Sequence, residues 1–297
     1  MKRTVLLVVA AAAVALGAWS QLLWRVDGNG LSKPSYLMGT HHMAPASFID
    51  SISGLGDALN ACDAVYGELR EEELSSSDAQ QRMALALMAP ADSTLDKVLT
   101  PSEYAVVKRV VDGCMAPMGL TAEMFNMLKP QALSLQLQLM QATMNFPDYD
   151  PKNQIDATVQ RRGMAAGKEL GAFETVDDQI KVLFAATIKE QAQGLVEMCE
   201  YNDDYKRVID EQCKAYIGQD IDFLYGQVLD PGVGSTPTDA ELERLVWGRN
   251  RNWVGQLVKL MPEKSIFVCV GVGHLPGDKG LIALLRGAGY TVTPVSK

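Results

Sequence analysis

The three histidines of the 297-residue chain, His41, His42 and His274, are its most informative side chains. They fall in two segments, 39–42 (GTHH) and 271–274 (GVGH), which share the pattern G-x-x-H. A histidine can act as a general base or bind a transition metal near neutral pH. Two matching segments at opposite ends of a chain that has no other histidine predict one shared functional site.

The sequence around the two segments follows one plan. An apolar run precedes each segment, and a proline, a helical pattern and a second short apolar run follow it. Each half is typical of a β-α-β unit with parallel strands. Ligands of open α/β sheets bind at the carboxyl ends of strands, so we expect His42 and His274 to line one crevice. Gly39 and Gly271 would let the backbone turn tightly and approach a ligand closely.

Glu68 lies near the end of the apolar run 64–69, so it could reach the same crevice. Two imidazoles and a carboxylate suit a divalent transition metal with open coordination positions. Such a metal lowers the pKa of bound water and generates hydroxide near neutral pH. We therefore predict His42, His274 and Glu68 as metal ligands, with Glu68 alternatively acting as a general base. The competing hypothesis is that each histidine has a structural role at the end of a strand.

Two further charged residues are candidates for chemistry. Arg249 lies on the apolar face of a predicted helix, 239–260, between Leu242 and Trp253. A buried guanidinium needs a carboxylate or another acceptor, so Arg249 forms either a structural ion pair or a clamp for a developing oxyanion. Glu174 lies at another strand-to-helix junction, where it serves either the helix N-terminus or catalysis as an acid–base group.

The elements that must position these residues indicate an α/β fold. We predict a small, mixed, largely parallel sheet built from N- and C-terminal β-α-β units, with a large helical middle region. Thr100, Thr175 and Thr238 each stand three residues before an acidic residue, which predicts three capping boxes. Residues 21–297 would form a single domain with a helical insertion at about 75–260. Within the insertion we expect a helix that begins after Thr100, helices at 129–144, 156–167, 203–229 and 239–260, and a strand at 168–174.

The N-terminus has the composition of a targeting segment. Lys2 and Arg3 precede an uncharged run of 21 residues that ends before Arg25. This pattern is typical of a secretory signal peptide over residues 1–20, or of an uncleaved anchor that spans a bilayer. We expect the remainder to fold outside the cytoplasm, in the periplasm or after secretion, and to meet a membrane only through this segment.

Charge and cysteine content exclude other classes of function. Without Lys2 and Arg3, 25 basic and 36 acidic residues remain, for a net charge of −11. That balance argues against nucleic acid as a partner. The five cysteines show no C-x-x-C spacing, which argues against a thiolate zinc site. Because an odd number leaves at least one cysteine unpaired, we expect Cys269, within an apolar run, to be a free thiol.

With these residues in place, the chain resembles the TraB/GumN family, which includes the Tiki proteins of animals. The segments that carry the resemblance are YLMGTHHMAP, VYGEL, GAFET, RNRNW and VGVGHLPGDKGLIALLRGAGYTVTPV. The family is marked by paired G-x-x-H motifs, an acidic residue after the first motif and an arginine before the second. These features fall at His42, Glu68, Arg249 and His274, and His41 occupies a variable position of the first motif. The resemblance implies a metal-dependent, peptidase-like site that uses manganese or cobalt, with zinc as a further candidate. The family is also distantly similar to erythromycin esterases and to haem-binding ChaN proteins.

Together these observations predict an extracytoplasmic, metal-dependent hydrolase that acts on a peptide or protein substrate. His42 and His274 would bind the metal, Glu68 would be the third ligand or the general base, and Arg249 would stabilise the oxyanion. Glu174 is the reserve acid–base candidate. One alternative is a metal-independent, esterase-like hydrolase with His42 as the general base. The other is a periplasmic protein that binds a peptide or haem without turnover.

Overall fold

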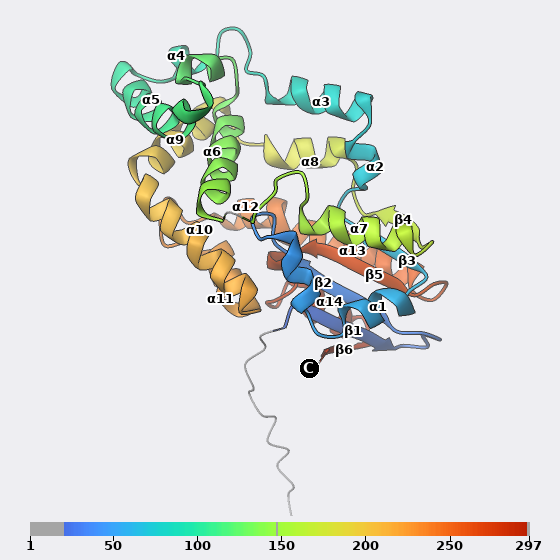
Figure 1. Cartoon of the computed structure of the whole chain (residues 1–297). Helices are drawn as coiled ribbons and strands as arrows, with labels where there is room; N and C mark the ends of the chain where they lie inside the picture. The colour runs from blue at the N-terminus through green and yellow to red at the C-terminus, as the bar shows by residue number, and fades with distance from the viewer. Residues whose placement is uncertain (1–20, 147, 296–297) are drawn as a thin grey trace, which may run out of the picture.

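A six-stranded sheet forms the lower half of the molecule in Figure 1, in a computed structural model that describes residues 21–146 and 148–295. The strand order is β4-β3-β5-β2-β1-β6. Strands β2, β5, β3 and β4 are mutually parallel, and β1 runs antiparallel to both β2 and β6. The prediction of a mixed, largely parallel sheet is therefore confirmed. The strands are β1 (Leu23–Gly28), β2 (Ser35–Thr40), β3 (Ala64–Gly67), β4 (Glu169–Ala172), β5 (Ile266–Gly271) and β6 (Tyr290–Pro294).

The strands of the two predicted β-α-β units are interleaved in the sheet. The first leads from β2 through a short 3₁₀ helix and α1 (Leu55–Ala61) to β3, and the second leads from β5 through α14 (Leu281–Gly287) to β6. Strand β5 lies between β2 and β3, so the strand of the second unit is inserted into the first. The strands that precede the two G-x-x-H segments are therefore direct neighbours, with Thr40 opposite Gly271.

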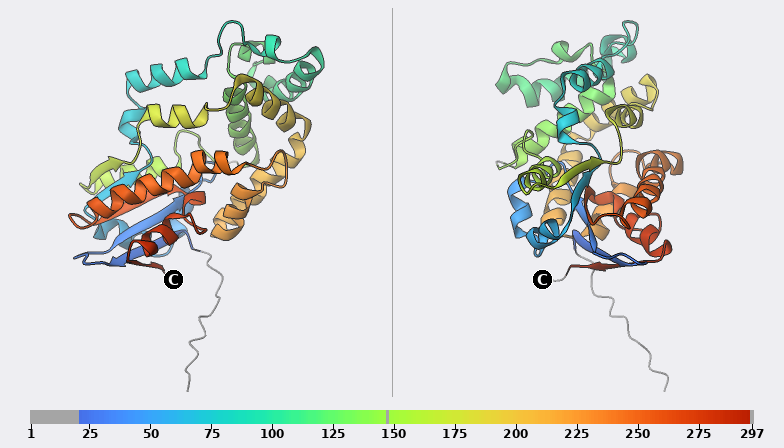
Figure 2. Two further views of the ribbon diagram at one scale, coloured as in Figure 1. Left: turned by 180° about the vertical axis from the view of Figure 1, so that it is seen from behind. Right: turned by 90° about the vertical axis from the view of Figure 1, so that its right-hand side faces the viewer.

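Helices cover both faces of the sheet. In the right-hand view of Figure 2, α1 and α7 (Ile155–Ala165) lie on one side of the sheet, and α13 (Gly248–Leu260) and α14 lie on the other. Strand β5 is fully buried from Ile266 to Val270, as expected for a parallel strand that is covered on both faces. This double covering explains why the sequence of β5 is continuously apolar rather than alternating.

Strand β1 was missed by the sequence analysis, which placed no element between residue 20 and the apolar run that leads to Gly39. Its residues Leu23, Trp24 and Val26 are fully buried. The turn that joins β1 to β2 contains Gly28, Asn29 and Gly30, all with positive φ. A short apolar run followed by glycine and asparagine predicts a β-hairpin. Here the start of the run overlaps the uncharged N-terminal stretch that ends before Arg25, so the strand was not recognised.

The middle of the chain is helical, as predicted, and has a second apolar core. That core includes Val111, Leu133, Leu137 and Leu195 and is separate from the core around the sheet. The predicted capping boxes at Thr100, Thr175 and Thr238 are present. The helices of this region are α2 (Glu71–Leu74), α3 (Ser77–Leu87), α4 (Leu95–Val98), α5 (Pro101–Met115), α6 (Pro130–Asn145), α8 (Val176–Leu183), α9 (Ile188–Glu200), α10 (Asn202–Ile217), α11 (Ile221–Leu229) and α12 (Asp239–Leu242).

Two helix predictions in this region need correction. The helix expected at 203–229 is broken between α10 and α11, because Gln219 takes a positive φ of 60° and the Asp220 side chain caps the new helix at Phe223 N. The helix expected at 239–260 contains a π-helical segment, Glu243–Trp247, between α12 and α13. Within the described residues, every helix is too short or too polar to cross a bilayer. The predicted signal segment, 1–20, lies outside the described residues.

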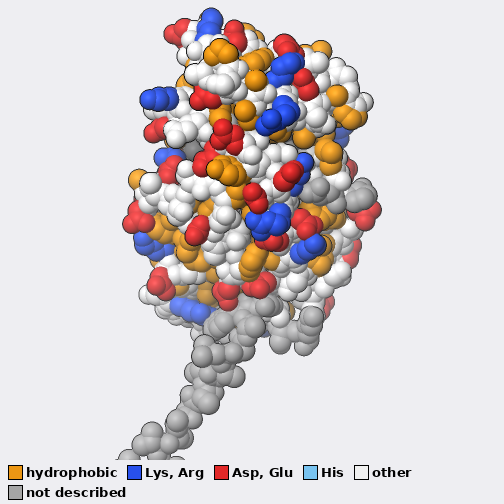
Figure 3. Space-filling model, turned by 90° about the vertical axis from the view of Figure 1, so that its left-hand side faces the viewer, with side chains coloured by type: hydrophobic (Ala, Val, Ile, Leu, Met, Phe, Trp, Pro, Cys, Tyr) orange, Lys and Arg blue, Asp and Glu red, His pale blue; other side chains and the backbone are white. Residues whose placement is uncertain are grey.

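The surface charges and the cysteines have arrangements that are common in globular proteins. On the face shown in Figure 3, acidic and basic side chains are interspersed. All five cysteines are buried free thiols, Cys269 among them as predicted.

The motif glycine Gly39 generates the first testable prediction. A Cβ atom at Gly39 would lie 2.9 Å from Val272 Cγ2 and 3.0 Å from both Val272 Cα and Leu275 Cδ1. We expect Gly39→Ala to lower the free energy of unfolding by about 1–3 kcal/mol through overpacking, measured by urea denaturation. Gly56→Ala in α1 is the matched control, because a Cβ there meets nothing within 4 Å, and we expect it to be neutral or slightly stabilising. Equal effects of the two substitutions would contradict this account.

Candidate active site

The candidate site lies at the carboxyl ends of the parallel strands. Thr40 ends β2, Gly271 ends β5, Glu68 directly follows β3, and Glu174 follows β4 by two residues. The strand register therefore brings together four chain segments that are far apart in sequence. Gly271 has φ of −50° and Gly39 lies within β2, so neither glycine is needed for a tight turn. Both are needed for close approach, because a Cβ at Gly271 would lie 3.3 Å from Glu68 Oε1.

Arg249 is the centre of the site and uses all five of its N–H donors. Nε donates to Glu174 Oε1 at 2.7 Å, and Nη2 donates to Glu174 Oε2 at 2.9 Å and to Glu68 Oε2 at 2.5 Å. Nη1 donates to the Leu245 carbonyl at 3.0 Å and to His274 Nε2 at 3.2 Å. The side chain is 14% exposed, so the ion pairs are largely shielded from water. Of the two hypotheses for Arg249, the structure shows the buried ion pair, and the pairing is bidentate toward Glu174. The role as an oxyanion clamp stays a prediction.

The π-helical segment directly before Arg249 helps to place this side chain. Within it, the Gly248 N–H donates to the carbonyl of Glu243, five residues back. The Leu245 carbonyl accepts a hydrogen bond from the Arg249 side chain. Single π-helical turns often occur at functional sites because they re-aim side chains on one face of a helix.

The two glutamates are held differently. Glu68 Oε1 accepts a hydrogen bond from the Gly271 N–H at 2.9 Å, and Oε2 accepts one from Gln179 at 3.1 Å. Burial alone would raise the pKa of Glu68, but His274, Arg249 and His42 outweigh burial and lower it to about 2. Glu174 is buried and also accepts a hydrogen bond from Trp253 Nε1 at 3.0 Å. Its side-chain partners, Arg249 and Trp253, both lie on α13, so Glu174 holds Arg249 in place, a role that neither of the two sequence hypotheses included.

His274 is buried, and its tautomer follows from its neighbours. Asn250 Nδ2 donates to the carbonyl oxygens of His274 and Lys279, at 3.2 and 2.9 Å. Asn250 Oδ1, 2.7 Å from His274 Nδ1, is therefore the acceptor, and Nδ1 carries the proton. The lone pair on Nε2 faces Arg249 and lies 3.9 Å from Glu68 Oε1. Burial lowers the pKa of His274 to about 4, which keeps the ring neutral near pH 7.

His42 differs from His274 in being open to solvent. Its side chain is 62% exposed, and its Nδ1 lies 3.4 Å from Asp156 Oδ2. The Asp156 carboxylate raises the pKa of His42, and because the ring is exposed we expect water to limit the size of the rise. His41 points elsewhere, against Tyr216 with ring centroids 5.5 Å apart, and accepts a hydrogen bond from Met43 N. Of the two adjacent histidines, only His42 lies beside Asp156 and lines the pocket next to Glu68.

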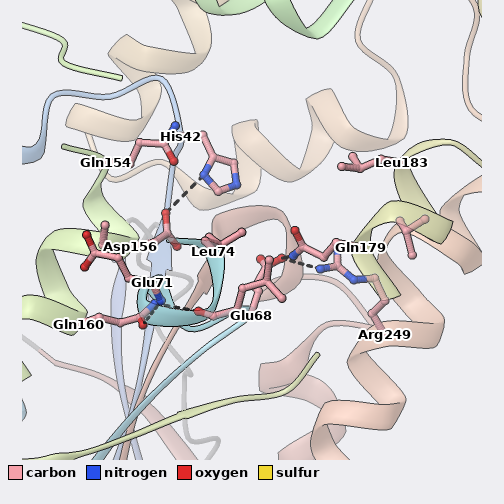
Figure 4. Close-up of a pocket in the computed structure, with 13 residues that line it drawn as sticks. His42, Glu68, Glu71, Leu74, Gln154, Asp156, Gln160, Gln179, Leu183 and Arg249 are labelled. Carbon is pink, nitrogen blue, oxygen red and sulfur yellow. Dashed lines mark hydrogen bonds and ion pairs between the residues drawn. The ribbon is translucent and has the colours of Figure 1, made fainter. Parts of the chain in front are cut away.

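A pocket of about 300 Å³ joins His42 to Glu68 and Arg249. Figure 4 shows His42 and Asp156 on one side of it and Glu68, Gln179 and Arg249 on the other. The volume is at the lower end of the range for ligand pockets. His274 lies behind Arg249 rather than in the lining.

Asp156 is the main residue that the sequence analysis missed. Its Oδ1 accepts a hydrogen bond from the Thr40 hydroxyl at 2.7 Å, while its buried Oδ2 has no hydrogen-bond partner among the described residues. The carboxylate thus connects the first turn of α7 to the end of β2. In sequence it resembles an ordinary acidic residue near a helix N-terminus, so no local signal marks it. Asn250 and Gln179, which hold His274 and Glu68, were missed for the same reason.

The donor set suits a divalent metal in type but is not gathered around one point. Among the described residues, no three His, Cys, Asp or Glu side chains are grouped as a metal site requires. His274 Nε2 and Glu68 Oε1 lie within the range that two ligands of one ion can span, and Asp156 Oδ2 is a buried oxygen without a hydrogen bond. The Arg249 guanidinium, however, already holds the lone pair of His274 and one oxygen of Glu68.

The three histidines should titrate in two groups. Burial and the neighbouring His42 lower the pKa of His41 to about 4, as burial does for His274, whereas Asp156 raises the pKa of His42. We expect proton NMR to show one imidazole that titrates above its ordinary value of about 6.5 and two that stay neutral down to about pH 5. Asp156→Asn should lower the midpoint of the first by about one unit. Three coincident titrations, or no shift in the variant, would contradict this assignment.

Removal of the positive partner from the central ion pairs should be strongly destabilising. Arg249→Ala leaves Glu68 and Glu174 buried without a positive partner, and we expect it to lower the free energy of unfolding by about 3–5 kcal/mol. Arg251→Ala is the matched control, because Arg251 is 51% exposed and pairs with Glu243 at the surface. We expect that control to cost about 0.5 kcal/mol or less. Chemical denaturation measures both, and similar losses would show that the buried group is not the stabilising one.

Comparison with known proteins identifies the family to which the chain belongs. The model of the TraB/PrgY/gumN family matches residues 22–294, nearly the whole chain. No curated protein and no solved structure matches the chain. The family match covers both G-x-x-H segments and every residue of the candidate site. The chain therefore belongs to the TraB/PrgY/gumN family.

Proposed function

We propose that the protein is a hydrolase that cleaves a peptide bond in the pocket between His42 and Arg249. The observation that carries this proposal is the arrangement of the pocket. An exposed histidine, oriented by a carboxylate, faces a buried group of charges across a cavity that can admit a substrate. General acid–base catalysis requires a titratable group of this kind within reach of the scissile bond.

His42 is the proposed general base. Asp156 lies beside Nδ1, so Nε2 is the nitrogen that remains to accept a proton from the attacking water. The paired carboxylate stabilises the protonated imidazole that forms, which is the role of the acid in a histidine–carboxylate pair. The proton can then be returned to the leaving group.

Arg249 is the proposed oxyanion stabiliser. Two of its nitrogens are held by carboxylates, whereas Nη1 donates only to the neutral acceptors His274 Nε2 and Leu245 O. Hydrogen bonds to neutral acceptors are weaker than those to carboxylates, so Nη1 is the donor that an anionic intermediate can recruit at the lowest cost. Glu68 and Glu174 keep the guanidinium in place while this happens.

A divalent metal is part of the proposal. In this metal-dependent form of the proposal His42 is a ligand instead of the general base: His42, His274 and Glu68 would hold manganese, cobalt or zinc, since imidazole and carboxylate are suitable ligands. When bound, the ion lowers the pKa of a water molecule and polarises the scissile carbonyl. Arg249 would have to release the His274 lone pair for this to occur.

A metal-independent hydrolase is the second candidate, and a specific observation favours it. His42 and Asp156 form a histidine–carboxylate pair without any metal, and Arg249 already provides positive charge beside Glu68. An extracytoplasmic location is proposed for either candidate, on the composition of residues 1–20.

One experiment separates these candidates. Residues 21–297, freed of metal, would be assayed on a quenched-fluorescent peptide library and on simple esters, with and without Mn²⁺, Co²⁺ or Zn²⁺. We expect His42→Ala to lower kcat/KM by about 10²–10⁴-fold, as for loss of a general base. His41→Ala is the control and should stay within a few-fold, because His41 packs against Tyr216.

The metal dependence gives the second comparison. If a metal takes part, activity and bound metal should both be lost in His274→Ala as well as in His42→Ala. Activity that resists chelation but needs His42 would support the metal-independent candidate. Activity that survives within a few-fold in both variants would overturn the proposed site.

A further inference from the structure

The pocket has an apolar wall that the proposed chemistry does not use. Leu69 follows β3, Leu74 ends α2, and Val182 and Leu183 end α8. In Figure 4, Leu74 lies between His42 and Glu68, and Leu183 lies above Gln179 and Arg249. The reacting groups and the apolar wall are thus parts of one cavity.

Three of these four apolar side chains are not part of the neighbouring core. Leu69 belongs to a small buried cluster with Ala79 and Val176, which joins α3 to α8. Leu74, Val182 and Leu183 belong to none of the buried clusters of the described residues, and Leu74 is 42% exposed. Apolar surface left open beside polar groups in a concave site is typical of a ligand contact.

The wall is held in place by polar links between α8 and the α2–α3 segment. Arg82 forms an ion pair with Asp177 at 2.8 Å, and the Val176 N–H donates to Glu73 Oε1 at 3.3 Å. Gln179, one turn along α8, donates to Glu68. Helix α8 therefore holds both Glu68 and the apolar wall, and so fixes the distance between them.

We infer that this wall binds an apolar side chain of the substrate next to the bond that is cleaved. Since it names the substrate class, the inference rests on the proposed function. The substrate is then a flexible peptide segment with an aliphatic or aromatic residue at that position. A cavity of about 300 Å³ accommodates such a side chain and the adjoining backbone, but not a folded surface.

Charge in the pocket supports an apolar rather than an acidic side chain. Glu68, Glu71 and Asp156 all line the cavity. Each carboxylate has a partner: Glu68 pairs with Arg249, Glu71 with Arg161 and Asp156 with His42. An acidic or a basic side chain would therefore meet charges that are already paired, and it would lose its hydration against the leucines.

The test compares peptides that differ at one residue. N-acetylated, C-amidated peptides with Leu, Phe, Ser, Asp or Lys at the varied position would be assayed for cleavage, and their binding to the protein measured by calorimetry. We expect Leu and Phe peptides to exceed Asp and Lys peptides by at least ~10-fold in kcat/KM, the usual discrimination of an apolar pocket. Cleavage of all five at similar rates would overturn the inference.

Substitutions in the apolar wall test whether the wall causes the preference for Leu and Phe peptides. Leu183→Asp and Leu74→Asp should each reduce kcat/KM for the Leu peptide by at least ~10-fold, and Leu183→Lys should improve the Asp peptide relative to the Leu peptide. Leu85→Asp is the matched control, because Leu85 is 67% exposed on α3 and lies outside the pocket. Circular dichroism would confirm that each variant is folded. A Leu preference that persists in both pocket variants would also overturn the inference.

The calorimetric binding measurements test this inference separately from the proposed hydrolysis. If no peptide is cleaved but the Leu peptide binds at least ~10-fold more tightly than the Asp peptide, and Leu183→Asp removes the difference, the hydrolysis proposal fails and the apolar subsite stands. If peptides are cleaved without regard to the varied residue, the hydrolysis proposal stands and the subsite fails. Equal binding of all peptides in the absence of cleavage overturns both.

Discussion

The buried guanidinium of Arg249 is the interaction on which the rest of the site depends. One positive charge is shared by Glu68 at the end of β3 and Glu174 after β4, and it also reaches the lone pair of His274 after β5. An unpaired charge at this depth would be very costly, so each of these elements can take its place only when the others are present. The ion pairs thus couple the sheet, the α8 region and α13 into one structure.

Close packing of the strand ends makes that coupling possible. Glycine at 39 lets Val272 and Leu275 pack directly on β2, and glycine at 271 lets the Glu68 carboxylate lie against the backbone of β5. Trp253 completes the arrangement from the other side, since it stacks on Phe173 and lies under the Arg249 guanidinium. The buried charges are therefore surrounded by groups that cannot move far, which keeps their geometry constant.

The pocket combines this fixed half with a more open one. His274 is buried, neutral and fixed in one tautomer, whereas His42 is exposed and pairs with Asp156. Two histidines in matching motifs have thus been given different environments and different protonation. The proposed hydrolysis would use this division, because one imidazole can exchange protons while the other orients the charged group.

Much of this could be predicted from the sequence, because the signals are local. Apolar runs, capping residues and the repeated G-x-x-H pattern indicated the β-α-β units, several helices and the residues His42, Glu68, Arg249 and His274. Because Arg249 lies on the apolar face of its predicted helix, the sequence alone indicated that its guanidinium needs buried acceptors. These inferences succeed because periodicity and spacing act within one element.

Only the tertiary structure decided which groups face one another. The insertion of β5 between β2 and β3, the Asp156–His42 pair and the capture of the His274 lone pair by Arg249 join residues that are 25 to 231 positions apart. Local sequence carries no signal for such contacts: an aspartate in the first turn of a helix has the same pattern whether it faces water or an imidazole. The pairing of distant strands sets these contacts, and it depends on how the whole sheet buries its two faces.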